Sequence, residues 1–308
     1  MDILERYPGS IDLHARHAEH VYLVARGFMP IEGIEEISTS WQRSANTYGV
    51  DPLCNETPHI LTAGEIEDHR GPLEKLIFNA QVEIDRLYAV VRRSGYAILL
   101  CDTTGTAIEH RGEDAESNRF KYWGTWLGGV WSEAIEGTNG IGTCITEERP
   151  ITIHRSQHFR TRHKNLSCSG APIFGVDGRL TTVLDVSAVD PELSDRAHAL
   201  TGALTVTAAR AIEERVFREH FNRDWIVALA PPDEDTPGML LAVDSSQRIV
   251  AQTAPRADIS YSTIQGYELA SVCGAYLNEM SRCFGVGMGL ISLRDWSSRV
   301  AARRGPRS

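Results

Sequence analysis

A glycine-rich run from Glu136 to Thr143 constrains the fold of this chain more than any other feature. Three glycines fall within six residues, and glycine adopts backbone conformations that other residues avoid. A β-like segment, Ile151 to His154, and a second apolar segment, Cys168 to Ile173, follow closely. A tight turn that leads into two strands predicts the rim of a pocket, and nothing beside it indicates a reaction.

Glycine-rich runs also occur in phosphate-binding loops, where backbone N–H groups hold an anion. The Gly-Lys-Ser/Thr ending of that motif is absent, and no Gly-Lys dipeptide occurs in the 308 residues. We therefore favour a structural turn over a nucleotide site. A pocket-lining role for Thr138 and Asn139 is the alternative.

The formal net charge of −10 opposes binding of nucleic acid by the chain as a whole. The stretch from Arg294 to Ser308 is an exception, because it carries five arginines against one aspartate. Direct contact with nucleic acid is therefore not expected, except as a rival hypothesis that uses this basic tail.

The six cysteines lie far apart and include no Cys-x-x-Cys pair, unlike a disulfide framework or a zinc ribbon. No apolar run approaches the roughly 20 residues that span a bilayer, and the first residues lack the order of a signal peptide. The sequence therefore predicts reduced thiols in a cytoplasmic protein without membrane contact.

Helical signals dominate the first third of the chain. Ser38 is expected to cap a short helix, and Thr62 with Glu65 forms a capping box for a second helix that Gly71-Pro72 should kink. An apolar stripe at steps of four and three then predicts a long helix, and its members are Leu73, Ile77, Ala80, Ile84, Leu87 and Val91.

Strand signals follow this helix as short apolar runs that are bounded by turn residues. The expected strands are residues 96–101, 106–110, 151–154, 167–174 and 179–188, with Pro172 at an edge or a bulge. Asp190 and Pro191 then open a second long helix, and residues 239–251 suggest one more hairpin before a helix at 263–283. The order predicts an α+β fold.

Aromatic residues gather immediately before the glycine run, at Tyr122, Trp123, Trp126 and Trp131. Aromatic walls with a few polar groups suit a small organic ligand, although ordinary core packing explains each residue equally well. Asp185 lies in an otherwise apolar strand, where a carboxyl group needs a partner. It is either a ligand anchor or a carboxylate held by the backbone.

His154, His158 and His163 fall within ten residues, and Cys144 and Cys168 are close to them in sequence. These are possible metal or haem ligands, but the spacing fits no metal template. We predict no cofactor and no metal; haem, or a metal on the three histidines, is the alternative. The two thiols are expected to be buried and inert, because nothing in the sequence lowers their pKa.

Taken together, several segments resemble the N-terminal sensory region of sigma-54-dependent transcriptional activators of acetoin and dihydroxyacetone operons. The matching segments are Ser40 to Ser44, Gly49 to Pro52, Gly95 to Leu100, Glu136 to Thr143, His158-Phe159, Cys168 to Ile173, Gly178 to Leu180 and Val183 to Ser187. The resemblance implies a GAF domain, in which helices flank an antiparallel sheet with a ligand cavity on one face.

The expected organisation combines this resemblance with a change of composition after Phe221, where Pro231 to Pro237 indicates an exposed acidic linker. It comprises an N-terminal helical segment (1–70), a GAF domain (71–222), an acidic Pro-rich linker (223–238) and a small C-terminal α/β module, PAS-like or degenerate, with the basic tail (239–308). Family members continue into a AAA+ ATPase and a helix-turn-helix domain, and this sequence is expected to contain neither.

The leading hypothesis is a cytoplasmic, homodimeric sensor that binds a small organic metabolite and acts on transcription through a regulatory protein partner. Its predicted ligand-binding residues are Tyr122, Trp123, Trp126, Trp131, Thr138, Asn139, Cys144, His154, His158, Phe159, Cys168 and Asp185. No catalytic motif is present, so catalysis is not expected. The rivals are a GAF-fold enzyme, haem or metal protein that uses the His154 to Cys168 region, and an accessory DNA-binding regulator that uses the arginine-rich tail.

Overall fold

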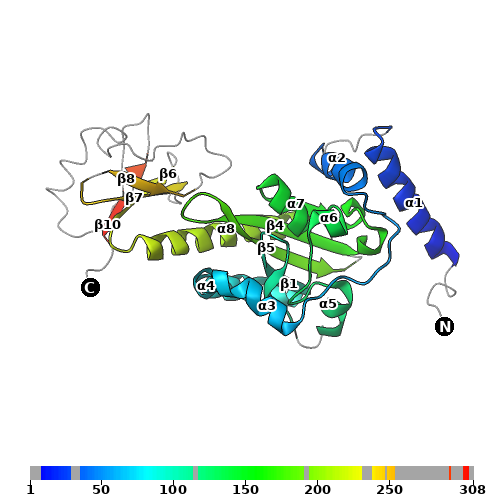
Figure 1. The fold of residues 1–308 in the computed structure, drawn as a ribbon, viewed down its shortest axis with the longest axis horizontal. Helices are drawn as coiled ribbons and strands as arrows, with labels where there is room; N and C mark the ends of the chain where they lie inside the picture. The colour runs from blue at the N-terminus through cyan, green and yellow to red at the C-terminus, as the bar shows by residue number, and fades with distance from the viewer. Residues whose placement is uncertain are drawn as a thin grey trace. The chain divides into compact units, whose positions relative to one another are not determined.

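The computed structural model describes residues 8–28, 35–113, 117–190, 194–230, 238–246, 248–253, 291–292 and 301–304 (Figure 1). The chain divides into two compact units. Unit 1 comprises Met1–Ile173 and Leu180–Arg210, and unit 2 comprises Phe174–Arg179 and Ala211–Ser308.

Unit 1 is built on a five-stranded sheet with the strand order β2-β1-β5-β4-β3. The strands are β1 (Tyr96–Asp102), β2 (Ala107–Arg111), β3 (Ile151–His154), β4 (Leu166–Phe174) and β5 (Leu180–Val189). β1 pairs antiparallel with β2 and β5, and β3 pairs antiparallel with β4. The predicted GAF-like antiparallel sheet is therefore confirmed.

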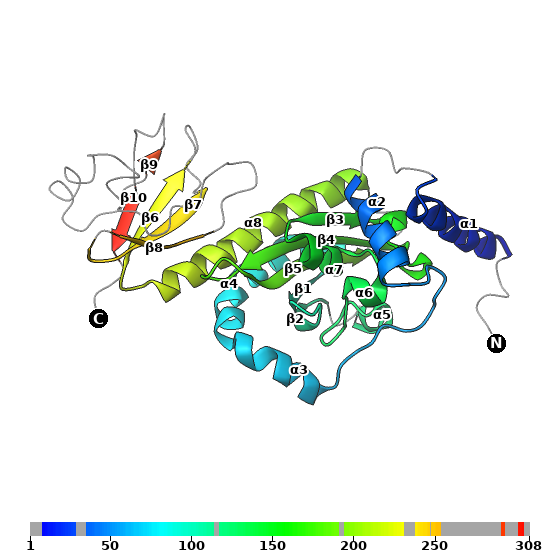
Figure 2. The same ribbon diagram turned by 45° about the horizontal axis from the view of Figure 1, so that its top comes forward.

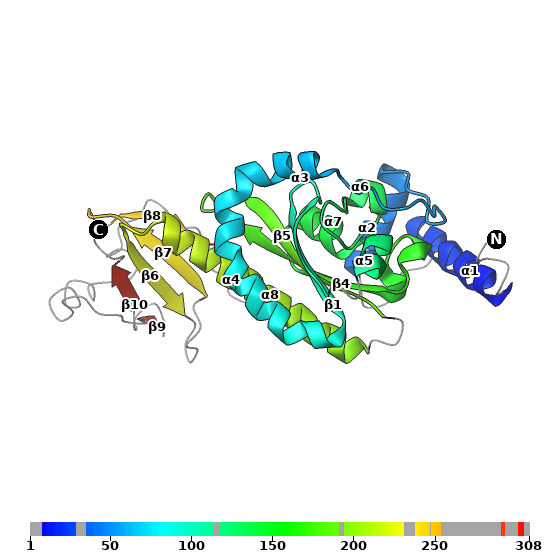
Figure 3. The same ribbon diagram turned by 90° about the horizontal axis from the view of Figure 1, so that it is seen from below.

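Helices lie on both faces of this sheet (Figures 2 and 3). One face carries α4 (Glu74–Val91) and the first part of α8 (Asp195–His220). The other face carries α5 (Ser117–Trp123), α6 (Glu133–Glu136) and α7 (Gly140–Glu147). α4 contacts β1 and β2, whereas α7 contacts β3 and β5.

The alternation of side chains along the strands explains why both faces are covered. β1 is buried along its whole length. Leu99 and Cys101 pack in one cluster with Ile141 of α7 and Cys168 of β4. Because successive strand residues point to opposite faces, Ile98 and Leu100 are directed to the α4 side. A strand that is buried on both faces reads as a continuous apolar run.

The N-terminal helices are α1 (Pro8–Ala25), α2 (Glu35–Gln42) and α3 (Ala63–Arg70). The predicted capping box of α3 is confirmed, because Thr62 and Glu65 satisfy each other's backbone N–H groups. A single 3₁₀ turn at Gly71–Leu73 then separates α3 from α4, as the Gly-Pro pair predicts. The cap predicted at Ser38 is wrong, because α2 begins three residues earlier, with the acidic residues Glu35 and Glu36 in its first turn.

The apolar stripe predicted on α4 packs within unit 1. Ile77, Ala80, Ile84, Leu87 and Val91 are all buried, whereas Leu73 lies in the preceding 3₁₀ turn and is only partly buried. This stripe therefore packs inside unit 1 and does not form an exposed apolar surface. The large apolar side chains that α4 leaves exposed are Phe78, Val82 and Val90.

Pro172 lies near the end of β4, which is an interior strand of the sheet. The pairing of β3 with β4 runs from Ile151 opposite Gly170 to His154 opposite Ser167. Pro172 therefore falls beyond the last residue of β4 that β3 pairs with. β4 is thus not the edge strand that Pro172 could indicate, but Pro172 lies outside the part of β4 that pairs with β3.

The glycine-rich run forms the turn between α6 and α7. Asn139 caps α7 by accepting hydrogen bonds from the N–H groups of Ile141 and Gly142, at 2.9 and 2.8 Å. Gly170 of β4 lies directly against this turn, because a Cβ added to it would stand 2.1 Å from the carbonyl oxygen of Gly140. The predicted structural turn is thus a helix N-cap pressed onto the sheet.

Gly170→Ala is expected to lower the free energy of unfolding by about 3 kcal/mol, since the added methyl group overlaps backbone atoms in a packed core. Gly64→Ala in α3 is the matched control, because nothing lies within 4 Å of its added Cβ. That change should be neutral or slightly stabilising. Urea titration of both variants checks the prediction, and equal midpoints would contradict it.

Unit 2 contains a second sheet with the order β10-β6-β7-β8, and β9 (Ile291–Ser292) pairs parallel to β6. Its strands are β6 (Trp225–Ala230), β7 (Met239–Val243), β8 (Ile249–Gln252) and β10 (Ala301–Arg304). The hairpin expected at residues 239–251 is present as β7 and β8. The helix expected at 263–283 lies outside the described residues.

Two arginines of the expected basic tail, Arg303 and Arg304, belong to β10 and pair with Ile226 and Trp225 of β6. Arg294, Arg299 and Arg307 lie outside the described residues. In the described helices, no segment is long and apolar enough to cross a membrane.

Candidate functional site

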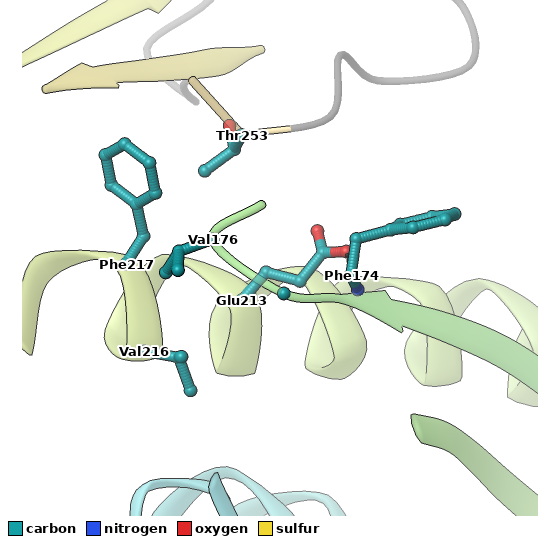
Figure 4. A pocket seen from close by; sticks show the side chains of 7 residues that line it. Phe174, Val176, Glu213, Val216, Phe217 and Thr253 are labelled. Atoms are coloured by element: carbon teal, nitrogen blue, oxygen red, sulfur yellow. Dashed lines mark hydrogen bonds between the residues drawn. The ribbon is translucent and has the colours of Figure 1, made fainter. Parts of the chain in front are cut away.

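A small pocket of about 10 Å³ lies in unit 2, between α8 and the loop after β4 (Figure 4). Phe174, Val176, Val216, Phe217 and Thr253 line it together with Glu213, whose carboxylate accepts a hydrogen bond from the Phe174 N–H at 2.8 Å. This volume holds about one water molecule. The pocket is too small for an organic metabolite, and none of the predicted site residues line it.

The four aromatic residues predicted to form a ligand wall lie in different environments. Trp131 is buried, and its indole N–H donates to the Gly124 carbonyl at 2.8 Å. Trp123 and Trp126 are partly buried, and the Trp126 ring packs against His110 at a tilt of 44°. Tyr122 is 65% exposed. Trp131 is therefore the member of this group that lies deepest in unit 1.

Thr138 and Asn139 both hold the turn together. The Thr138 hydroxyl lies 2.7 Å from the hydroxyl of Ser40 on α2. Besides capping α7, the Asn139 amide donates to the carbonyl groups of Trp131 and Gly137, at 3.1 and 2.8 Å. These contacts tie α2, α6 and α7 to one point.

Cys144 and Phe159 are fully buried in an apolar cluster with Trp41 and Ile153. Burial raises the pKa of the Cys144 thiol well above its usual value. A neutral buried thiol is a poor nucleophile, which agrees with an inert role.

Four predicted or neighbouring polar groups form a buried chain on the α7 face of the sheet. His158 Nε2 lies 3.3 Å from the sulfur of Cys168, and the Ser187 hydroxyl oxygen lies 3.2 Å from the same sulfur. Ser187 also bonds Oδ2 of Asp185. Burial raises the pKa of Cys168, again in the direction that opposes thiolate chemistry.

Asp185 is fully buried, and burial raises its pKa to about 7. Its second oxygen, Oδ1, has no hydrogen-bond partner among the described residues. That oxygen faces Gly140, since a Cβ added to Gly140 would stand 2.9 Å from it. The carboxyl group is thus held close to the turn, with half of its acceptors unused.

His154 lies apart from these four buried polar groups, on the side of the sheet that faces α8. Its ring stacks on His198 at 4.9 Å between centroids, and its Nε2 lies 2.9 Å from Asp195. Within the described ranges, no three His, Cys, Asp or Glu side chains are placed to hold a metal ion. His154, His158 and His163 are therefore not brought together as a metal site there.

A charged cluster that the sequence did not predict lies beside Trp131. We call it the Glu136 cluster, and it consists of Glu136, Arg160, Arg162 and His163. Their residues are between 0% and 8% exposed. α6 supplies Glu136, and the 3₁₀ turn Thr161–His163 with the residue before it supplies the other three.

Glu136 is the centre of this cluster. Its Oε2 lies 3.2 Å from Arg160 Nη1 and 3.5 Å from His163 Nε2. Burial raises the pKa of Glu136, against the opposing effect of Arg160 and Arg162. The His163 ring lies 5.1 Å from the Trp131 ring, so an aromatic surface borders the charges.

The polar atoms of the cluster are poorly satisfied by the protein. Arg162 Nε and Nη1, Arg160 Nε, both ring nitrogens of His163 and Oε2 of Glu136 are buried without a hydrogen-bond partner in the described part of the chain. Native interiors leave few buried polar atoms in this condition, and each calls for an explanation. Unused polar atoms, most of them arginine donors, are thus concentrated at one place, which is compatible with a site that a polar guest completes.

Comparison with known proteins adds to this geometry. The family described as the N-terminal domain of MimR matches residues 12–214. The acetoin catabolism regulatory protein of Cupriavidus necator is 32% identical over 217 residues, which is 70% of this chain and 32% of the relative. The propane 2-monooxygenase operon transcriptional activator MimR of Mycolicibacterium smegmatis is 26% identical over 204 residues, or 66% of this chain and 33% of the relative.

The acetoin dehydrogenase operon transcriptional activator AcoR of Bacillus subtilis is 27% identical over 153 residues, or 50% of this chain and 25% of the relative. The chain thus spans about a quarter to a third of the length of these curated relatives. A chain in the crystal structure of the E. coli DhaR(N)–DhaL complex superposes with a TM-score of 0.53 at 13% identity, covering 88% of this chain and 99% of that one. At this identity the likeness shows a shared fold.

Proposed function

The chain belongs to the family of MimR N-terminal domains, and from that premise we propose that it senses a small organic molecule in unit 1 and passes the signal to a protein partner that controls transcription. The relatives are transcriptional activators, and the region they share with this chain is the sensory part of such regulators. We also propose that this sensor acts in the cytoplasm.

The observation that carries the proposal is the Glu136 cluster, in which several buried donors and one carboxylate oxygen lack hydrogen-bond partners among the described residues. Burying a polar group without a hydrogen bond costs about 1–3 kcal/mol, so a guest that supplies acceptors regains this energy on binding. Trp131 offers an apolar surface beside the charges. Polar anchors next to an aromatic wall are the usual composition of a small-molecule site.

The other predicted site residues remain part of the proposal in a secondary role. His158, Cys168 and Asp185 form a polar chain on the same face of the sheet, and the rings of His158 and His163 lie 6.2 Å apart. These polar side chains connect the Glu136 cluster to the turn at Gly140. Movement of a guest against His163 therefore has a packed route to α7.

A protein partner is proposed by analogy with DhaR(N), which was crystallised with DhaL. We also retain the homodimer. The apolar stripe of α4 does not supply its interface, because that stripe is buried within unit 1. Sedimentation equilibrium with and without a bound compound measures the oligomeric state.

Thermal unfolding tests the binding step. Acetoin, 2,3-butanedione, propan-2-ol, pyruvate and lactate are the probes, each on the wild type, on His163→Leu and on the exposed-site control His59→Leu. A compound at 100 times its Kd should stabilise the wild type and the control by about 2.7 kcal/mol, and His163→Leu much less. If no compound changes the midpoint, or if His163→Leu responds like the wild type, the proposal is wrong.

A further inference from the structure

The guanidinium group of Arg162 lacks a counter-charge of its own. The residue is 8% exposed, and Nε and Nη1 have no hydrogen-bond partner in the described residues. Arginine keeps its proton in proteins, so the group is a buried cation in the free protein. A buried charge is stable only when it is paired and hydrogen-bonded.

The buried positive charges of the Glu136 cluster outnumber its buried carboxylates. Glu136 acts on Arg162, but the same carboxylate lies 3.2 Å from Arg160 Nη1 and is shared between the two arginines. Glu56 also acts on Glu136, yet it is exposed, where water screens its charge. Two arginines against one buried carboxylate leave an excess of one positive charge.

The neighbouring groups do not change this balance. Burial lowers the pKa of His163 well below its usual value, so its ring is neutral and offers hydrogen bonds without charge. Glu133, also on α6, is engaged by Arg43, whose Nε lies 2.6 Å from it. The excess charge therefore stays at Arg162.

We propose that the guest of the Glu136 cluster is a small monoanionic carboxylate that pairs with Arg162. The planar guanidinium matches a carboxylate with two parallel hydrogen bonds, and one negative charge neutralises the excess. A phosphate, with nearly two charges, would overshoot this balance. The aromatic surface of Trp131 beside His163 suits a short apolar chain on the same molecule.

The approach to Arg162 agrees with entry of a small anion. Tyr122 and Cys54 act electrostatically on the guanidinium, and both are at least partly exposed. At least partly exposed side chains therefore lie near Arg162. The cluster is tightly packed elsewhere, since a Cβ added to Gly137 would stand 2.6 Å from Phe159. Only a compact guest suits such surroundings.

This inference rests on the proposed sensory function and is tested by matched pairs of compounds on the full chain. Calorimetric titration uses acetate, butyrate, lactate and pyruvate, each against its own primary amide, with phosphate and the neutral probe acetoin alongside. At least one carboxylate should bind the wild type tenfold or more tightly than its amide. Its affinity should fall as salt rises.

Two variants assign the effect to Arg162. Arg162→Met should weaken carboxylate binding at least 100-fold, and Arg162→Lys, which keeps the charge but not the planar fork, should weaken it about tenfold. Circular dichroism establishes folding, and Arg162→Lys alone decides if Arg162→Met does not fold. Arg179→Met is the exposed control and should bind as the wild type does.

The possible failures are distinguishable. The carboxylate proposal is overturned by any of four results. These are equal affinity for acid and amide, tightest binding of phosphate, binding that survives in both Arg162 variants, and a preference for acetoin that needs His163 but not Arg162. The last of these would leave the sensory function standing. Absence of binding by every compound would overturn both.

Discussion

Replacing Arg162 with methionine is expected to raise the free energy of unfolding of the ligand-free protein by about 1–4 kcal/mol while removing ligand binding. Methionine fills much of the same volume and carries no charge to desolvate. The wild-type residue is buried, and two of its nitrogens lack partners in the described structure. A side chain that is retained for binding costs stability when the site is empty.

Urea unfolding of the wild type, Arg162→Met and Arg179→Met checks this expectation. The Arg179 side chain is 88% exposed, so its replacement should change stability by no more than about 0.5 kcal/mol. A loss of 2 kcal/mol or more in Arg162→Met alone would mean that the guanidinium serves folding. The Glu136 cluster would then be a structural ion network.

Stability is expected to increase with pH between about pH 4 and 6.5, because unit 1 buries neutral histidines. Burial lowers the pKa of His158 to about 3 and those of His110 and His198 to about 4, from 6.5 in each case. Below pH 6.5 these histidines bind protons in the unfolded chain but stay neutral in the folded chain. Each such histidine contributes about 1.4 kcal/mol per pH unit within its window, and the contribution is lost as the pH falls.

Asp185 acts with the opposite sign. Burial raises its pKa from 3.8 to about 7, so between these values the folded chain holds a proton that the unfolded chain has released. This carboxyl therefore lowers stability as the pH rises toward 7. A shift of about three units corresponds to roughly 4 kcal/mol, which is fully expressed only above pH 7.

Asp185→Asn should consequently steepen the rise between pH 5 and 6.5 and raise stability at pH 8, by as much as about 4 kcal/mol if the amide satisfies the same contacts. His158→Gln should instead flatten the rise by about one proton. Urea unfolding from pH 5 to 8 measures both slopes. Parallel curves for the three proteins would show that neither group titrates as its burial requires.

Local sequence signals anticipated much of unit 1. Capping at Thr62, the Gly-Pro break and the apolar runs of β1 and β5 are each set within a few residues, so the pattern alone identifies them. The glycine run was rightly expected to form a structural turn. The need for glycine at this place follows from a contact between distant residues, because Gly140 and Gly170 lie against each other without room for a side chain.

The features that the sequence did not reveal depend on contacts between distant residues. Ser38 looked like a cap, yet the acidic pair Glu35-Glu36 begins the helix. Nothing in the sequence marks Arg160 and Arg162 for burial, since arginine is rarely buried. Two arginines and a histidine within four residues, from Arg160 to His163 and close to a predicted pocket, are the available signal. Only the fold shows that Glu136 cannot neutralise both.

The account depends on Arg162 being an anion receptor, and its guanidinium can be observed directly by NMR. The Nε–Hε resonance of Arg162 is identified by its loss in Arg162→Lys and is followed while the tightest-binding carboxylate is added to the full chain. The account predicts a large shift of this resonance and slower hydrogen exchange at saturation, with exposed arginines unchanged. An Arg162 resonance that stays in place while the ligand binds would contradict it.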